Sequence, residues 1–148
     1  MIKVIAIFNL LQLTLGTCAY CLKKEEKMSD SGNLYAYIKF ADSVAIEPEA
    51  LISHWTIYRA TFDDDDISDH LVGLIAGKSG RTTSAIQTFR GELGQIITTS
   101  RRVYTLYGPP GFHEEADFVW QKWKLNCRVI KDVNVSDQYA KQIKNNIN

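Results

Sequence analysis

The fold is decided by residues 70–107, which read HLVGLIAGKSGRTTSAIQTFRGELGQIITTSRRVYTLY. Strand-like runs rich in β-branched and aromatic residues alternate here with glycine-containing turns. The runs are residues 70–76, 82–90, 95–99 and 102–107. The turns at 77–80 and 91–94 are short enough to join antiparallel neighbours. This segment therefore predicts a meander of four strands.

Working outward toward the N-terminus, residues 34–40 and 54–62 also have strand composition. Pro48 predicts a short helix over residues 48–53, because proline loses no hydrogen bond in the first turn of a helix. The sheet would then have about six antiparallel strands. We expect it to be bent or barrel-like, since that limits exposed strand edges.

Toward the C-terminus, the Gly-Pro-Pro-Gly sequence at residues 108–111 ends the sheet, because proline cannot donate to a strand ladder. An amphipathic helix is expected next, with its apolar stripe at Ala116, Val119, Trp120 and Trp123. The two tryptophans would anchor it on the sheet, and Asn126 could end it. A last strand over 127–133 and a short C-terminal helix capped at Ser136 complete a single α+β domain over residues 29–148.

Composition narrows the function classes. The chain has 148 residues with 17 basic and 17 acidic side chains. This length excludes a large two-domain enzyme, and the 45% hydrophobic content excludes a disordered chain. The zero net charge argues against overall electrostatic binding to nucleic acid or to an anionic membrane.

Residues 1–28 are a signal-like segment or a mis-annotated leader. Lys3 precedes an apolar run over 4–15, and Thr17-Cys18-Ala19 resembles a signal cleavage site. The run is too short for a stable membrane span. Alternatively, the sequence KKEEK at 23–27 is compatible with a ribosome-binding sequence, so translation could begin at Met28. A start at Met28 predicts a cytoplasmic protein. A genuine signal segment predicts a secreted protein or an envelope lipoprotein.

The number of cysteines in the mature chain depends on which of these two readings holds. Cleavage after Ala19 would leave Cys21 and Cys127 as a pair that could bridge in an oxidising compartment. A start at Met28 would leave Cys127 alone, as a small buried hydrophobic residue. The spacing matches no zinc motif, so we expect no metal and no cofactor.

Catalytic motifs do not match. The sequence at 73–79 resembles a phosphate-binding loop but has three residues, not four, between its first glycine and Gly-Lys-Ser. His54, His70 and His113 share no nucleophile or metalloprotease signature with their neighbours. We therefore expect a protein that is not an enzyme.

Two charged sets are candidate binding residues. The acidic run Asp63, Asp64, Asp65 and Asp66 could attract a basic partner, although such runs are usually hydrated loops. A basic set could follow single-stranded nucleic acid on a curved sheet, or could simply keep the sheet soluble. This basic set comprises Lys78, Arg81, Arg90, Arg101 and Arg102. The glycosylation triplet at 134–136 matters only in a eukaryotic secretory route.

The sequence at 99–111, followed by Asp117-Phe118-Val119-Trp120, resembles a pattern in short bacterial, plasmid and phage proteins. In that pattern a strand ending in Tyr-x-Leu is followed by a Gly/Pro break and a helix containing tryptophan. The resemblance implies a bacterial or viral cytosolic origin and brings no activity with it.

These observations predict a small non-catalytic binding protein that acts by occupying a macromolecular partner, most simply a protein. A phage- or plasmid-encoded inhibitor or accessory factor would be one such protein. Two alternatives stay open: an exported envelope or extracellular binding module, and a binder of single-stranded nucleic acid through a basic strand face.

Overall fold

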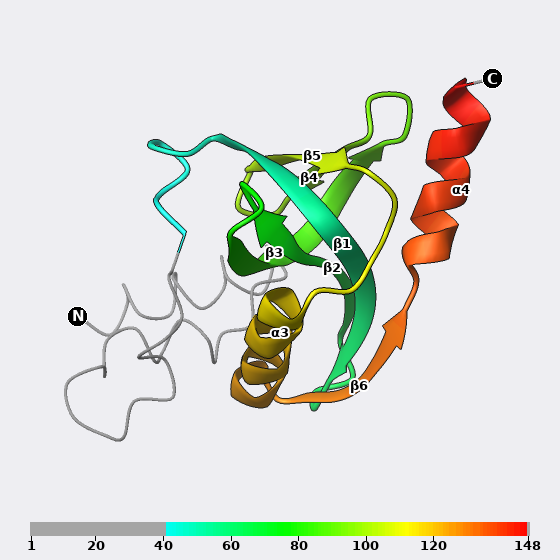
Figure 1. Cartoon of the computed structure of the whole chain (residues 1–148). Coiled ribbons are helices and arrows are strands. Elements are labelled where there is room, and N and C mark those ends of the chain that lie inside the picture. The colour runs from blue at the N-terminus through cyan, green and yellow to red at the C-terminus, as the bar shows by residue number, and fades with distance from the viewer. Residues whose placement is uncertain (1–40, 148) are drawn as a thin grey trace, which may run out of the picture.

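The computed structural model describes residues 41–147, in which six strands form one mixed sheet and two helices pack on it (Figure 1). The strands are β1 (Glu49–Phe62), β2 (Ile67–Ile75), β3 (Ser79–Arg90), β4 (Gln95–Thr98), β5 (Val103–Tyr107) and β6 (Val129–Asn134). The helices are α3 (Glu114–Cys127) and α4 (Ser136–Ile147). The predicted α+β class is confirmed, and the strand predicted over 34–40 lies outside the described residues.

The sheet follows the predicted meander. Each of β2, β3, β4 and β5 pairs antiparallel with the next. β1 pairs antiparallel with β2 and β6 but parallel with β5. The parallel pair follows from the strand count, because five consecutive antiparallel strands leave the fifth running in the direction of the first. The prediction of a wholly antiparallel sheet was therefore wrong at this one pair.

The short helix predicted over 48–53 is also wrong. Residues 49–53 are the beginning of β1 and pair with Val103–Tyr107 of β5. Pro48 lies just before this strand, and its carbonyl accepts a hydrogen bond from the Val103 N–H at 3.0 Å. A proline suits the position before a strand as well as the first turn of a helix, so the non-local pairing with β5 decides the outcome.

Side chains are buried on both faces of the sheet. Trp55 and Ile57 of β1 belong to one core cluster, which the partly buried α4 residues Tyr139, Ala140 and Ile143 also contact. Ala60 and Phe62 of the same strand belong to a second cluster. Neighbouring positions on a strand point to opposite faces, so the two clusters lie on opposite faces of β1.

The second cluster is covered by α3, as the helical stripe predicted. Ala116 and Trp120 are buried in it, and Trp123 packs against it. His113 caps the helix by accepting the Glu115 N–H on its Nδ1 atom at 3.2 Å. The helix ends at Cys127 and not at the predicted Asn126, and its C-cap residue is Arg128, which has a left-handed φ of 56°.

The helix α4 is fixed by one polar network. The Tyr139 hydroxyl donates to Asp69 Oδ2 at 2.7 Å, while Arg59 donates to both oxygens of the same carboxylate at 2.8 and 2.9 Å. Burial, followed by the bond to Asp69, raises the pKa of Tyr139. The phenol therefore stays protonated and remains the donor to Asp69.

Gly80 of β3 lies directly beneath α3. A Cβ atom built there would lie 2.8 Å from the Glu115 carbonyl carbon and 3.0 Å from Val119 Cγ2, with the Glu115 oxygen closer still. Because the obstruction is helix backbone, it can yield only if α3 moves. We expect Gly80→Ala to lower the free energy of unfolding by about 1–3 kcal/mol.

The matched control is Gly111→Ala, because a Cβ atom at Gly111 would meet nothing within 4 Å. That control should change the stability by less than about 0.5 kcal/mol. Equilibrium urea unfolding measures both variants. Equal stabilities for the two would mean that α3 does not rest on β3 as closely as described.

Candidate functional site

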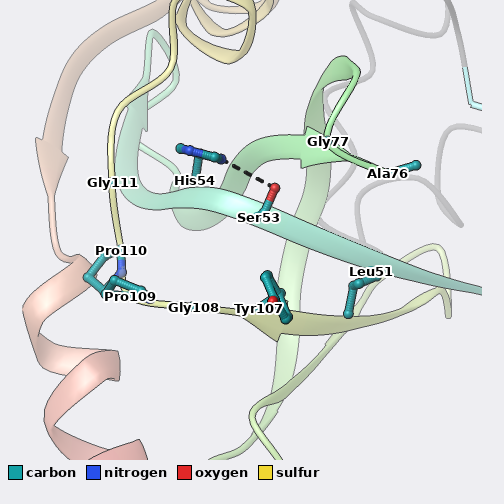
Figure 2. Close-up of a pocket in the computed structure, with 10 residues that line it drawn as sticks. All are labelled: Leu51, Ser53, His54, Ala76, Gly77, Tyr107, Gly108, Pro109, Pro110 and Gly111. Carbon is teal, nitrogen blue, oxygen red and sulfur yellow. Dashed lines mark hydrogen bonds between the residues drawn. The ribbon is translucent and has the colours of Figure 1, made fainter.

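The candidate site is an open groove of about 430 Å³ at the beginning of β1 (Figure 2). Three parts of the chain line it: the start of β1, the β2–β3 turn, and the end of β5 with the loop that follows. We call it the β1–β5 groove. Its lining residues are Leu51, Ser53, His54, Ala76, Gly77, Tyr107, Gly108, Pro109, Pro110 and Gly111.

The loop at 108–111 is held firmly against β1. The indole N–H of Trp55 donates to the Gly108 carbonyl and the Thr56 hydroxyl donates to the Gly111 carbonyl, both at 2.9 Å. The Gly111 N–H in turn donates to the Trp55 carbonyl at 2.9 Å. Since Trp55 is only 1% exposed, the core itself positions this wall of the groove.

A β-bulge brings His54 to the surface. The register between β1 and β2 shifts between Ser53 and Thr56, and His54 has a left-handed φ of 47°. Bulges of this kind redirect a side chain and often occur beside functional sites. The His54 ring lies 5.4 Å from the His113 ring, centroid to centroid.

The groove is mainly apolar. Leu51 is 51% exposed and Tyr107 is 65% exposed, although both are large hydrophobic residues. Figure 2 shows these two side chains next to each other, with the prolines of the loop further along the wall. Concave apolar surfaces with a few polar groups are typical of ligand-binding sites.

The polar groups in the groove lining belong to the side chains of Ser53, His54 and Tyr107. His54 Nδ1 lies 3.3 Å from Ser53 Oγ, a long contact for a general base and its nucleophile. Among the described residues that line the groove there is no Asp, Glu, Lys or Arg. The lining residues therefore include no carboxylate that would orient the histidine.

The acidic run forms the turn between β1 and β2, at the end of β1 away from the groove. All four aspartates are exposed. Backbone bonds close the turn, with the Phe62 N–H donating to the Asp66 carbonyl at 2.9 Å. Asp63 Oδ2 lies 3.5 Å from Arg128 Nη1. The structure thus presents the run as an exposed turn.

The basic set is divided into two kinds of position. Arg81 and Arg102 meet at Glu47, whose carboxylate lies 2.8 Å from Arg81 Nη1 and 3.7 Å from Arg102 Nη1. Arg102 also donates to the Glu47 carbonyl at 2.7 Å and to the carbonyl of Asp42. These two guanidinium groups therefore hold the segment before β1 against the sheet.

The other three basic residues are exposed and lie apart. Lys78 is in the β2–β3 turn, Arg90 ends β3, and Arg101 is in the β4–β5 turn with a left-handed φ of 69°. Lys78 and Arg90 stand at opposite ends of the 12-residue strand β3. The structure does not bring these three residues together.

His70 is buried and has both ring nitrogens bonded. Its Nδ1 lies 2.9 Å from the Thr83 carbonyl, which can only accept, so Nδ1 carries the proton. Its Nε2 accepts from the Ser68 hydroxyl at 2.7 Å. Burial lowers the pKa of His70 to about 4. The aromatic rings around it make this a structural position.

Cys127 is 1% exposed. Within residues 41–147 no group of three or more histidine, cysteine, aspartate or glutamate side chains could hold a metal ion. No helix in this part of the chain is long and apolar enough to cross a membrane.

Sequence reasoning did not identify the groove. The Gly/Pro break after a strand ending in tyrosine was recognised as the end of the sheet, and this was the available signal. Nothing in the sequence showed that residues 51–54 would lie beside that break, since they come from a strand more than 50 positions earlier.

Comparisons with known proteins give one local similarity. No protein-family model matches the chain, and no solved structure matches it. Two curated proteins from Aspergillus niger, each described as "Probable alpha-glucuronidase A", are 33% identical to it over 91 residues. The aligned region covers 62% of this chain and 10% of each relative. The chain thus spans about a tenth of the length of these relatives.

Proposed function

We propose that this chain is a small non-catalytic binding protein that acts by occupying a macromolecular partner, and that the β1–β5 groove receives the partner. The observation that carries the proposal is the groove itself. Its wall is fixed to the core through Trp55, and its exposed lining is apolar at Leu51 and Tyr107. A fixed apolar groove loses little conformational entropy when it binds a ligand.

The occupant that fits best is an extended protein segment bearing an apolar side chain. Grooves lined by aromatic residues are known to bind extended segments. The volume of about 430 Å³ holds one or two side chains. No charged side chain is among the lining residues that the structure describes, so recognition would depend on shape and apolar contact.

A glucuronide is a poorer fit. The name of the matched Aspergillus niger proteins describes an enzyme acting on α-glucuronides, and such a ligand carries a carboxylate at neutral pH. Recognition of a carboxylate is strongest with a lysine or arginine donor. The described lining of the groove offers neither.

Substitution of Leu51 tests the proposal. Leu51→Glu places a charge in the groove and should lower the affinity for the partner at least about tenfold, because the carboxylate would be desolvated on binding. Leu93→Glu is the matched control, since Leu93 is 57% exposed in the β3–β4 turn, outside the groove lining. Affinity purification from the producing cells identifies the partner, and calorimetry with the purified partner gives the affinities.

The proposal requires that Leu93→Glu bind like the parent chain while Leu51→Glu does not. Equal binding by both variants would exclude the groove as the binding surface. A non-catalytic role would be contradicted if the purified chain turned over a substrate and the His54→Ala variant did not.

The exposed acidic turn, residues 63–66, is a second candidate contact for a partner with a basic patch. A single-stranded nucleic acid is a weaker alternative. Arg81 and Arg102 are already engaged with Glu47, and the exposed Lys78, Arg90 and Arg101 lie in separate places. Affinity that does not fall with rising salt would exclude this alternative.

The cellular location of the protein depends on which form of the proposal holds. An exported envelope or extracellular binding module is one form of the proposal. A cytoplasmic inhibitor or accessory factor encoded by a phage or plasmid is the competing form of the proposal. Mass spectrometry of the mature N-terminus distinguishes the two.

We further propose that the sheet forms a barrel. β1 pairs with both β2 and β5, so the strand pairings β1–β2–β3–β4–β5 return to β1. A circuit of this kind leaves β6 as the strand with one paired side. Its physical benefit would be the removal of exposed edges from the other five strands.

A further inference from the structure

Asn134-Val135-Ser136 is the only Asn-x-Ser/Thr triplet in the 148-residue sequence. Such triplets, when the middle residue is not proline, are acceptors for N-linked glycans in the eukaryotic secretory route. The structure places this triplet where β6 ends and α4 begins. The proposed binding function does not use it.

The three residues differ in exposure and in bonding. Asn134 is exposed, whereas Val135 and Ser136 are buried. Asn134 Oδ1 accepts two hydrogen bonds from Ser136, one from the backbone N–H at 3.0 Å and one from the hydroxyl at 2.7 Å. The Ser136 hydroxyl oxygen in turn accepts the Ile57 N–H at 2.9 Å.

These bonds use the oxygen of the Asn134 side chain. Its nitrogen, Nδ2, makes no hydrogen bond within residues 41–147 and belongs to an exposed residue. The side chain therefore has one atom committed to the fold and another available for modification. We propose that Asn134 is a site of N-linked glycosylation.

Transfer of a glycan to Asn134 would leave its hydrogen bonds with Ser136 intact. Asn134 Nδ2 attacks the anomeric carbon of an oligosaccharide carried on a polyisoprenyl diphosphate, and a new carbon–nitrogen bond forms. The bond from the sugar to the diphosphate breaks, the lipid diphosphate leaves with the electron pair, and Nδ2 loses one proton. The product is still an amide, so Oδ1 can accept both bonds from Ser136.

The burial of Ser136 sets the order of events. The glycosylating enzyme must reach the serine hydroxyl of the triplet as well as the asparagine, and in the folded chain Ser136 is 4% exposed. Modification therefore precedes the packing of α4. This proposal rests on the exported form of the proposed function, because N-linked transfer takes place in the secretory route.

The site has a physical consequence for β6. This strand pairs with β1 on one side and ends the strand order of the sheet. Ile130 and Val133 on it are exposed. An unprotected edge with apolar side chains favours association between copies. A glycan at the last residue of β6 would hinder such association.

The test expresses the full chain through a eukaryotic secretory pathway and collects it from cells and medium. Trypsin releases residues 132–141, which contain the triplet between Lys131 and Lys141. We expect mass spectrometry to find this peptide glycosylated. Peptide N-glycosidase in ¹⁸O-labelled water should then remove the glycan, convert the asparagine to aspartate and introduce one heavy oxygen.

Two variants separate modification from folding. Asn134→Asp keeps a side-chain oxygen that can accept both bonds from Ser136 but lacks Nδ2, so it should fold and lose the glycan. Ser136→Thr keeps the hydroxyl and the triplet, so it should retain the glycan. An unmodified Asn134 in the parent chain, in both cells and medium, would overturn the proposal, and so would a glycan that persists in Asn134→Asp.

Discussion

Replacing Trp120 by alanine is expected to lower the free energy of unfolding by about 3–5 kcal/mol. Trp120 is fully buried at 0% exposure in the cluster beneath α3. Its ring stacks on Tyr58 at 4.8 Å and on Trp123 at 5.2 Å between centroids. The substitution removes these contacts and leaves a cavity that β1 and α3 can only partly fill.

A polar contribution adds to this loss. The Trp120 indole N–H donates to Asp132 Oδ2 at 3.1 Å, and Lys124 Nζ reaches the same oxygen at 3.1 Å. The variant would leave Asp132 with Lys124, so the carboxylate would stay partly compensated. The cost is therefore expected to come mainly from lost packing.

Phe118→Ala is the matched control for this prediction. Phe118 is an aromatic residue on the same helix, but it is 42% exposed and contacts Lys122, whose Nζ lies 5.5 Å from its ring centre. It should change the stability by less than about 1 kcal/mol. Urea unfolding followed by circular dichroism compares the two, and a loss below 1 kcal/mol for Trp120→Ala would contradict the packing of α3 described above.

The second large effect is a loss of stability in acid that depends on His70. Its pKa lies at about 4 in the folded chain, whereas the ordinary pKa of a histidine side chain is 6.5. Between these two values the unfolded chain binds a proton that the folded chain does not. The contribution of His70 is therefore complete above pH 6.5, falls as the pH drops toward 4, and changes no further below that.

The size of this effect follows from the pKa difference. About 2.5 pKa units correspond to roughly 3 kcal/mol between neutral pH and pH 4. Protonation would place a charge among Phe62, Trp120 and Trp123, the nearest ring centre being that of Trp123 at 4.6 Å. It would also turn Nε2 from an acceptor for the Ser68 hydroxyl into a donor.

Urea unfolding at a series of pH values tests this prediction through its slope. His70→Gln should be less stable than the parent at neutral pH, because the Thr83 carbonyl loses its donor. The difference between the two should narrow as the pH falls from 6.5 to 4. His54→Gln, at an exposed position, is the control for the loss of a histidine, and a parent-like slope in His70→Gln would show that another group causes the acid sensitivity.

Local sequence predicted the elements whose stability is mainly local or repetitive. The glycine turns at 77–80 and 91–94 set the meander, because short turns leave antiparallel pairing as the simple outcome. The stripe containing Ala116 and Trp120 predicted which face of α3 is buried. The helix α4 begins at Ser136, but the Ser136 hydroxyl bonds to Asn134 and to the Ile57 N–H and does not cap the helix as predicted.

Residues 48–53 show where local reasoning failed. Pro48 is compatible with a helix and with the start of a strand, and the residues after it form no strong pattern. Their partner is β5, more than 50 positions later in the chain. Pairing over such a distance leaves no local signal, so the first part of β1 could not be assigned from its own sequence.

The candidate site depends on the same long-range pairing. The parallel pairing of β1 with β5 places Leu51 beside the end of β5 and the proline loop. Charge patterns drew attention instead to the acidic run, which forms an exposed turn, and to the basic set, two members of which bind Glu47. A guanidinium held within the fold and one facing solvent look identical in sequence.

The sequence by itself determined the meander, the buried stripe of α3 and the glycosylation triplet, because turns, helical periodicity and short motifs act over a few residues. Only the tertiary structure decided the parallel β1–β5 pair, the groove beside it and the burial of His70. These features need segments far apart in the chain to meet, and the free energy that brings them together comes from burying both faces of β1.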